Sequence, residues 1–177
     1  MKKLLLHIAL FFSLIGFSQN EQLAQYYYDK GDFDKALVSY QELSNSLPSN
    51  PFYFQRKIDC MQQLLQFDPA EKEIQERLVR SKQSTLLVEL GYNFQLQKND
   101  AKAKKYYDEV IDRIRKNPNE VYGVANTFEK KVLLEYALKS YLTASEMVST
   151  FDFKYQTALL YGQLGNTDLM IANFLEE

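Results

Sequence analysis

Residues 28–50 read YDKGDFDKALVSYQELSNSLPSN, a short turn followed by an amphipathic segment and a second turn. The first turn, KGD at residues 30–32, is short enough to place the segments on either side antiparallel. Apolar residues then recur at helical spacing, as Ala36, Tyr40 and Leu43. Pro48 cannot continue a helix, so this stretch predicts one arm of a helical hairpin that ends just before it.

The same spacing returns along the rest of the chain. Small and aromatic residues follow one another at intervals of three, nine, four and three, as Ala24, Tyr27, Ala36, Tyr40 and Leu43, then Gly91, Phe94, Ala103, Tyr107 and Val110, then Ala125, Phe128, Ala137, Tyr141 and Ala144. A shorter copy reads Ala158, Tyr161, Met170 and Phe174, and a degenerate one reads Ile58, Met61, Ala70 and Ile74. The copies start 33 or 34 residues apart. A simple helical bundle is the alternative, but it has no reason to keep such a period.

Close packing of two antiparallel helices explains this pattern. Small residues let the helix backbones approach, and aromatic side chains fill the space beside them. The composition agrees, because the 177 residues include only 6 Gly and 4 Pro but 13 Tyr and 12 Phe. Few turn-forming residues and many long side chains favour helices.

Residues 28–50 and their copies resemble the tetratricopeptide repeat. The resemblance covers the chain from about Gln19 onward and is weakest in the second copy, where Ile58 replaces the small residue and Arg77 takes an interior position. It implies an all-α, right-handed superhelical solenoid of antiparallel helix pairs with about four and a half repeats. The expected divisions are repeat 1 at 19–50, a degenerate repeat 2 at 51–83, repeat 3 at 84–117, repeat 4 at 118–150 and an incomplete repeat 5 at 151–177.

The first 18 residues have the features of a secretory signal peptide. Lys2 and Lys3 precede a mostly apolar run at residues 4–17, which is too short to span a bilayer comfortably. Gly16 and Ser18 supply small residues for cleavage after Ser18, and an uncleaved anchor is the alternative. No cysteine follows the run to carry a lipid. We therefore expect a periplasmic or secreted protein, with no membrane span after cleavage and with a peripheral location at the outer membrane as one outcome.

The residues indicate no catalytic chemistry. There is no glycine-rich phosphate loop, no cysteine pair and no metal-binding histidine pattern, since the single histidine is His7 in the leader. The lone Cys60 fits a small buried apolar residue better than a reactive thiol. Charges total 21 basic and 23 acidic residues, which disfavours binding to nucleic acid. The prediction is a protein that is not an enzyme and that uses no cofactor or metal.

The tetratricopeptide resemblance implies that the first helix of each pair lines a groove for a partner peptide or helix. Helical spacing from the small framework residues places ten candidates on that groove, rich in tyrosine and amides: Gln25, Tyr28, Gln55, Gln62, Val88, Tyr92, Gln95, Tyr122, Asn126 and Tyr155. Tyrosine offers contact area and amides can bind an extended backbone, although the same residues could simply coat the surface. Glu21 and Asp59 stand where capture of a terminal carboxylate would need positive charge, so that activity is not expected.

These predictions combine into a non-enzymatic scaffold of the bacterial cell envelope that binds another protein. The last segment exposes apolar residues at Leu169, Ile171, Phe174 and Leu175, so we expect further repeats, self-association or a partner to cover them. The alternatives are an N-terminal recruitment arm of a larger secreted enzyme and an accessory protein for nutrient or glycan uptake.

Overall fold

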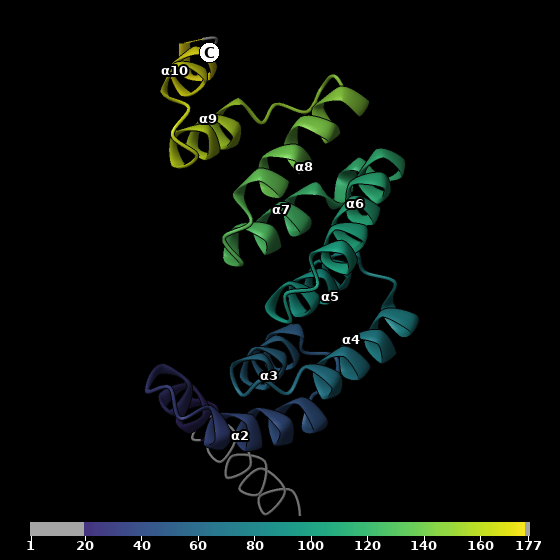
Figure 1. The fold of residues 1–177 in the computed structure, drawn as a ribbon, viewed down its shortest axis with the longest axis vertical. Helices are drawn as coiled ribbons and strands as arrows, with labels where there is room; N and C mark the ends of the chain where they lie inside the picture. Colours follow the sequence, from purple (N-terminus) through teal and green to yellow (C-terminus); the bar gives the residue numbers. More distant parts are fainter. Residues whose placement is uncertain (1–19, 176–177) are drawn as a thin grey trace, which may run out of the picture. The chain divides into compact units, whose positions relative to one another are not determined.

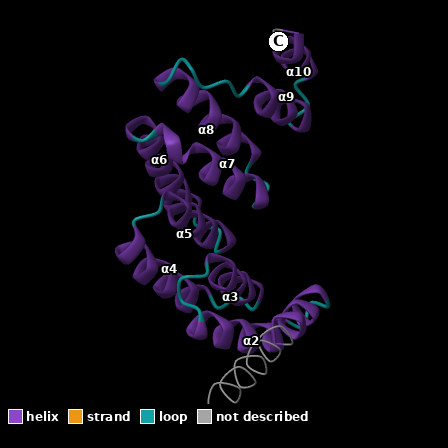
Figure 2. Ribbon diagram, turned by 180° about the vertical axis from the view of Figure 1, so that it is seen from behind, coloured by secondary structure: helices purple, strands orange, loops and turns teal. Residues whose placement is uncertain are grey.

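A computed structural model describes residues 20–175 of the chain, and the predicted signal peptide lies outside them. Every regular element in this part is a helix, as Figure 2 shows. After a helix at residues 20–29 come α2 (Phe33–Ser46), α3 (Pro51–Gln63), α4 (Phe67–Ser81), α5 (Ser84–Leu96), α6 (Asp100–Lys116), the 3₁₀ turn η1 (Pro118–Glu120), α7 (Val121–Lys130), α8 (Leu134–Met147), α9 (Lys154–Gln163) and α10 (Thr167–Leu175). The predicted all-α fold is confirmed.

The turn inside each helix pair has the same backbone geometry. One residue of each turn adopts a left-handed conformation, with φ between 57° and 81°, at Gly31, Leu65, Lys98, Val132 and Gly165. The next amide then donates back across the end of the first helix, for example from Asn99 to the Phe94 carbonyl at 2.9 Å and from Leu133 to the Phe128 carbonyl at 2.9 Å. This six-to-one bond closes a Schellman turn, which ends the first helix and reverses the chain.

The described residues fall into two compact units, residues 20–73 and 74–175, with the boundary inside α4. In the first unit α2 packs on α3, and the buried framework residues Ala24, Ala36 and Tyr40 lie in one core with Cys60. Cys60 is fully buried, as expected, and burial raises the pKa of its thiol to about 12. That environment stabilises the protonated thiol, the unreactive form.

The second unit contains three hairpins, α5 with α6, α7 with α8 and α9 with α10 (Figure 1). The first helices α5 and α7 pack on each other, and so do the second helices α6 and α8. These two hairpins therefore stack with their first helices in one layer and their second helices in another. Framework residues Ala103, Ala125, Ala137 and Ala158 are buried between the helices, at 3% exposure or less.

The small residue at position 91 shows why the spacing matters. A Cβ atom added to Gly91 would lie 2.3 Å from Cε1 of Tyr107 on α6, well inside van der Waals contact. The Tyr107 ring also contacts the rings of Phe128 and Tyr136, whose centroids are 5.5 Å and 4.9 Å away. Gly91 thus allows the ring of α6 to lie directly on the α5 backbone.

Candidate partner-binding surface

A buried tyrosine on the second helix of three pairs is hydrogen-bonded to the first helix. The hydroxyl of Tyr40 donates to Gln25 Oε1 at 3.0 Å, that of Tyr107 to Gln95 Oε1 at 2.8 Å and that of Tyr141 to Glu129 Oε1 at 3.5 Å. Burial raises the pKa of Tyr40 and of Tyr141 to about 12 and raises that of Tyr107 as well, so these hydroxyls stay protonated donors at neutral pH. The bonds hold Gln25 and Gln95, two of the predicted groove residues, in place.

In the first unit, the other predicted residues are partly or wholly covered. Tyr28 is half-buried, and the guanidinium of Arg56 lies 4.2 Å from the centre of its ring. Gln55 is half-buried and donates to Asp59 Oδ1 at 3.0 Å. Gln62 is only 3% exposed, so its side chain is not available on the surface. The sequence pattern did not single out Arg56, although its position after Gln55 places it beside the predicted groove.

In the second unit, the predicted groove residues differ in how much of their surface is exposed. Val88 is fully buried and belongs to the core, whereas Tyr92 is half-buried and Gln95 is exposed. Tyr122 and Tyr155 expose 57% and 56% of their surface, and Asn126 is also exposed. We use the term first-helix surface for Tyr92 of α5, Tyr122 and Asn126 of α7, and Tyr155 and Leu159 of α9. Leu159 is 43% exposed.

Aromatic rings support the exposed tyrosines. The centre of the Tyr122 ring is 5.2 Å from that of Phe153, just before α9, and 6.2 Å from that of Tyr141 on α8. Phe153 and Tyr141 are both buried. Tyr155 contacts Phe174 of α10, with the ring centres 6.0 Å apart. Edge-to-face contacts of this kind restrict the tyrosine rings while leaving much of each ring open to solvent.

Charge distinguishes the two layers of the second unit. The three first helices α5, α7 and α9 contain four charged residues in all, Glu89, Glu129, Lys130 and Lys154. The second helix α6 alone contains ten. A partner segment that lies along the first helices therefore meets aromatic and amide groups with little net charge.

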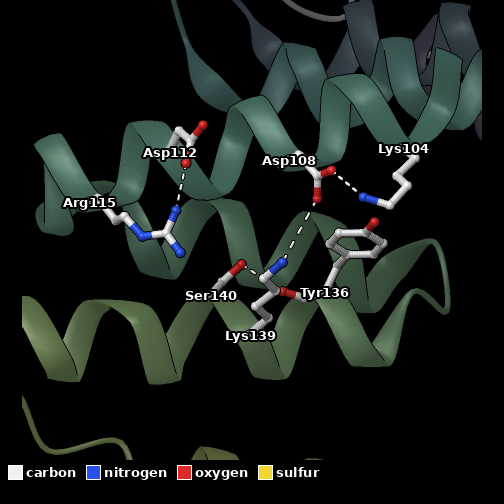
Figure 3. Close-up of polar contacts among 7 residues, drawn as sticks. All are labelled: Lys104, Asp108, Asp112, Arg115, Tyr136, Lys139 and Ser140. Atoms are coloured by element: carbon white, nitrogen blue, oxygen red, sulfur yellow. Dashed lines mark hydrogen bonds and ion pairs between the residues drawn. The ribbon is translucent and has the colours of Figure 1, made fainter. Parts of the chain in front are cut away.

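Several charged side chains of the second-helix layer form ion pairs with one another, as Figure 3 shows. Asp108 of α6 pairs with Lys104 one turn away and with Lys139 of α8, whose Nζ lies 3.8 Å from Oδ1. Arg115 pairs with Asp112 at 2.6 Å. Exposed pairs of this kind contribute little to stability.

A buried ion pair in the second unit was not predicted. Nζ of Lys131, in the turn after α7, lies 3.1 Å from Oε2 of Glu89 on α5, and the two side chains are only 10% and 2% exposed. The same ammonium lies 4.6 Å from the centre of the Tyr92 ring. The sequence feature that could have predicted this pair is Glu89, which lies inside the apolar run LLVEL at residues 86–90. An acidic side chain in such a run needs a partner of opposite charge when the run is buried.

Within residues 20–175, no group of three or more His, Cys, Asp or Glu side chains could hold a metal ion. A shallow depression of about 310 Å³ is lined by Glu135, Lys139 and Asn166 among others, none of which is a predicted groove residue. No helix in this part of the chain is both long and apolar enough to cross a membrane.

Comparison with known proteins supports a tetratricopeptide fold. Residues 86–113, in α5 and α6, match the tetratricopeptide repeat family. The solved structure of TTC0263, a thermophilic TPR protein of Thermus thermophilus, aligns over 90% of this chain and 89% of its own, with 18% identity and a TM-score of 0.50. MamA from Desulfovibrio magneticus RS-1 aligns over 90% and 92%, with 12% identity and a TM-score of 0.47. No curated protein matches the chain.

The similarity to TTC0263, with 18% identity and a TM-score of 0.50, concerns the fold alone. The described residues form antiparallel helix pairs of the tetratricopeptide type, as the sequence pattern predicted. Folds of this type typically serve in interactions between proteins.

Proposed function

We propose that this protein is a non-enzymatic scaffold that binds a segment of another protein on the first-helix surface of the second unit. The observation that carries the proposal is the pair of exposed tyrosines, Tyr122 and Tyr155, each in contact with a supporting aromatic ring. Large aromatic side chains held in place lose little conformational entropy when a partner covers them.

The chemistry of this surface favours a partner segment with apolar side chains and little charge. Tyr122, Tyr155 and Leu159 supply apolar contact area, and Asn126 can hydrogen-bond an extended backbone or a helix end. The scarcity of charge on α5, α7 and α9 offers no strong attraction to an acidic or basic segment.

The location of this activity is also part of the proposal. Lys2, Lys3 and the apolar run at residues 4–17 support export through a signal peptide. We therefore place the scaffold in the bacterial cell envelope, in the periplasm or secreted, where it would hold a component of an envelope or secretion complex.

Site-specific photo-crosslinking tests which face binds. A photoreactive amino acid is placed at Asn126 on the first-helix surface or, as a control, at Lys104 on the second-helix layer, and each protein is irradiated in envelope extract. We expect a discrete adduct from position 126 and none from position 104, identified by mass spectrometry. Equal adducts from both positions would mean that the first-helix surface has no special role.

The same adduct measures the contribution of the tyrosines. Tyr122→Ala with Tyr155→Ala should reduce the adduct yield at position 126 by at least tenfold, because a buried tyrosine anchor contributes about 2 kcal/mol or more to binding. Leu142→Ala on α8, where the leucine is 38% exposed, is the matched control and should leave the yield unchanged. An undiminished yield in the double variant would contradict the proposal.

A further inference from the structure

The Glu89–Lys131 pair joins two consecutive helix pairs of the second unit. Glu89 lies on α5 of one pair, and Lys131 begins the turn between α7 and α8 of the next. The backbone of this turn is closed by hydrogen bonds from the amides of Val132 and Leu133 to the carbonyls of Glu129 and Phe128, both 2.9 Å. The backbone at Lys131 is therefore fixed, and the lysine side chain extends to Glu89 of the preceding pair.

The ammonium of Lys131 contacts partners of different kinds. Its Nζ is 3.1 Å from the Glu89 carboxylate, which is buried, and 4.6 Å from the centre of the Tyr92 ring, which is half-buried. A partly desolvated ammonium near the face of a tyrosine attracts the ring. A single cation thus connects the core of the unit to a residue of the first-helix surface.

We infer that Lys131 is a positioning residue, which holds the Tyr92 ring in the orientation that a partner meets, while Glu89 holds the ammonium. This inference rests on the proposed function for its meaning, since Tyr92 belongs to the first-helix surface. The Lys131 side chain is too buried to make much direct contact with a partner. The orientation of the Tyr92 ring then depends on the next helix pair. The affinity of a partner that contacts Tyr92 would therefore depend on how the two pairs pack together.

The first unit contains a matched ion pair without a surface ring. Nζ of Lys57 lies 2.8 Å from Oε2 of Glu73, and the lysine side chain is 4% exposed. Lys57 also lies 5.5 Å from the centre of the Phe54 ring, but Phe54 is only 5% exposed. Lys57→Met therefore removes a comparably buried lysine from an ion pair, in which the Glu73 side chain is 33% exposed, and leaves Tyr92 alone.

Fluorine NMR on 3-fluorotyrosine placed at position 92 alone tests the inference without any partner. We expect Lys131→Met to shift or broaden the resonance beyond its width in the parent protein, Lys131→Arg to restore it, and Lys57→Met to leave it unchanged. Circular dichroism identifies the variants that fold. An unchanged resonance in folded Lys131→Met, or an equal change in Lys57→Met, would overturn the assignment.

A second variant covers the case in which Lys131→Met does not fold. Tyr92→Leu keeps both charges, and the εCH₂ proton resonance of Lys131 should then lose the upfield ring-current shift that the tyrosine face imposes. No change in that resonance would mean that the ring and the ammonium are not in contact in solution, and would also overturn the inference.

The crosslink at Asn126 separates this inference from the proposed function. Lys131→Met should lower the adduct yield, whereas Lys131→Arg and Lys57→Met should retain it. If the parent protein forms no adduct at all, the proposed function fails while the fluorine result still decides whether Lys131 orients Tyr92. If the parent forms the adduct and folded Lys131→Met keeps the full yield, the positioning role is wrong and the proposed function stands.

Discussion

Gly91 is a residue at which two helices of one pair pack very closely. The Tyr107 ring occupies the space that a side chain at position 91 would need, and Tyr107 is fixed there by its bond to Gln95 and by two neighbouring rings. The ring cannot move aside without losing these contacts. Gly123, on α7, differs, because a Cβ there would lie 3.7 Å from the Thr85 methyl carbon, an ordinary contact.

Gly91→Ala is therefore expected to lower the free energy of unfolding by about 1–3 kcal/mol, the usual cost of overpacking a core. Gly123→Ala should instead leave it unchanged or raise it by up to about 1 kcal/mol, because alanine is the better helix former. Urea denaturation followed by circular dichroism measures both. Equal stability of the two variants would show that α5 and α6 can adjust to accept a methyl group at position 91 without a loss of stability.

The turn within each helix pair is the element that reverses the chain between the two helices. All five turns place one residue in the left-handed region, yet only Gly31 and Gly165 are glycines. Val132 adopts φ 58° with a β-branched side chain that is 77% exposed, a combination that costs energy and gains little packing. The turn geometry thus follows from the packing of the helices on either side, even where the local residue disfavours it.

Val132→Gly should raise the free energy of unfolding by up to about 1 kcal/mol, since relief of the left-handed strain exceeds the added entropy of glycine. Gly31→Val places the same strain in the turn before α2, where φ is 76°, and should lower stability by a similar amount or more. Thermal unfolding of the two variants beside the parent protein measures the effect. A destabilised Val132→Gly would mean that the valine side chain makes a contact worth more than its strain.

Burial is uneven along the second unit as a whole. Helix α5 contains nine buried residues, whereas α10 contains none, and its Leu169, Ile171 and Leu175 are exposed. In a stacked array each pair is stabilised mainly by its neighbours, so a helix with fewer covered residues opens more readily.

Hydrogen exchange followed by mass spectrometry should therefore show a gradient within the second unit. Amides of α10 are expected to exchange fastest and those of α5 slowest at neutral pH, because opening α10 exposes little buried surface. Uniform protection across α5, α6 and α10 would indicate that the unit opens as one cooperative block or that another molecule covers α10.

The helical hairpins could be predicted from the order of residues, because the contacts that form them are local. The small residue and the buried tyrosine of one pair are 16 residues apart, as in Ala24 with Tyr40 and Gly91 with Tyr107, and this spacing alone places them on facing sides of two helices. The exposed tyrosines Tyr122 and Tyr155 followed from the same helical periodicity. The binding role of this surface and the divisions between repeats stay predictions.

The rest depends on contacts between one helix pair and the next, which the spacing within a pair does not describe. Val88 occupies the same helical face as the exposed candidates, yet it is buried, and Glu89 becomes stable inside the core because Lys131 reaches it from the following pair. A periodic pattern predicts which side of a helix faces inward. How far the neighbouring pair covers that side, and which charge it supplies, is decided by the packing of whole pairs in three dimensions.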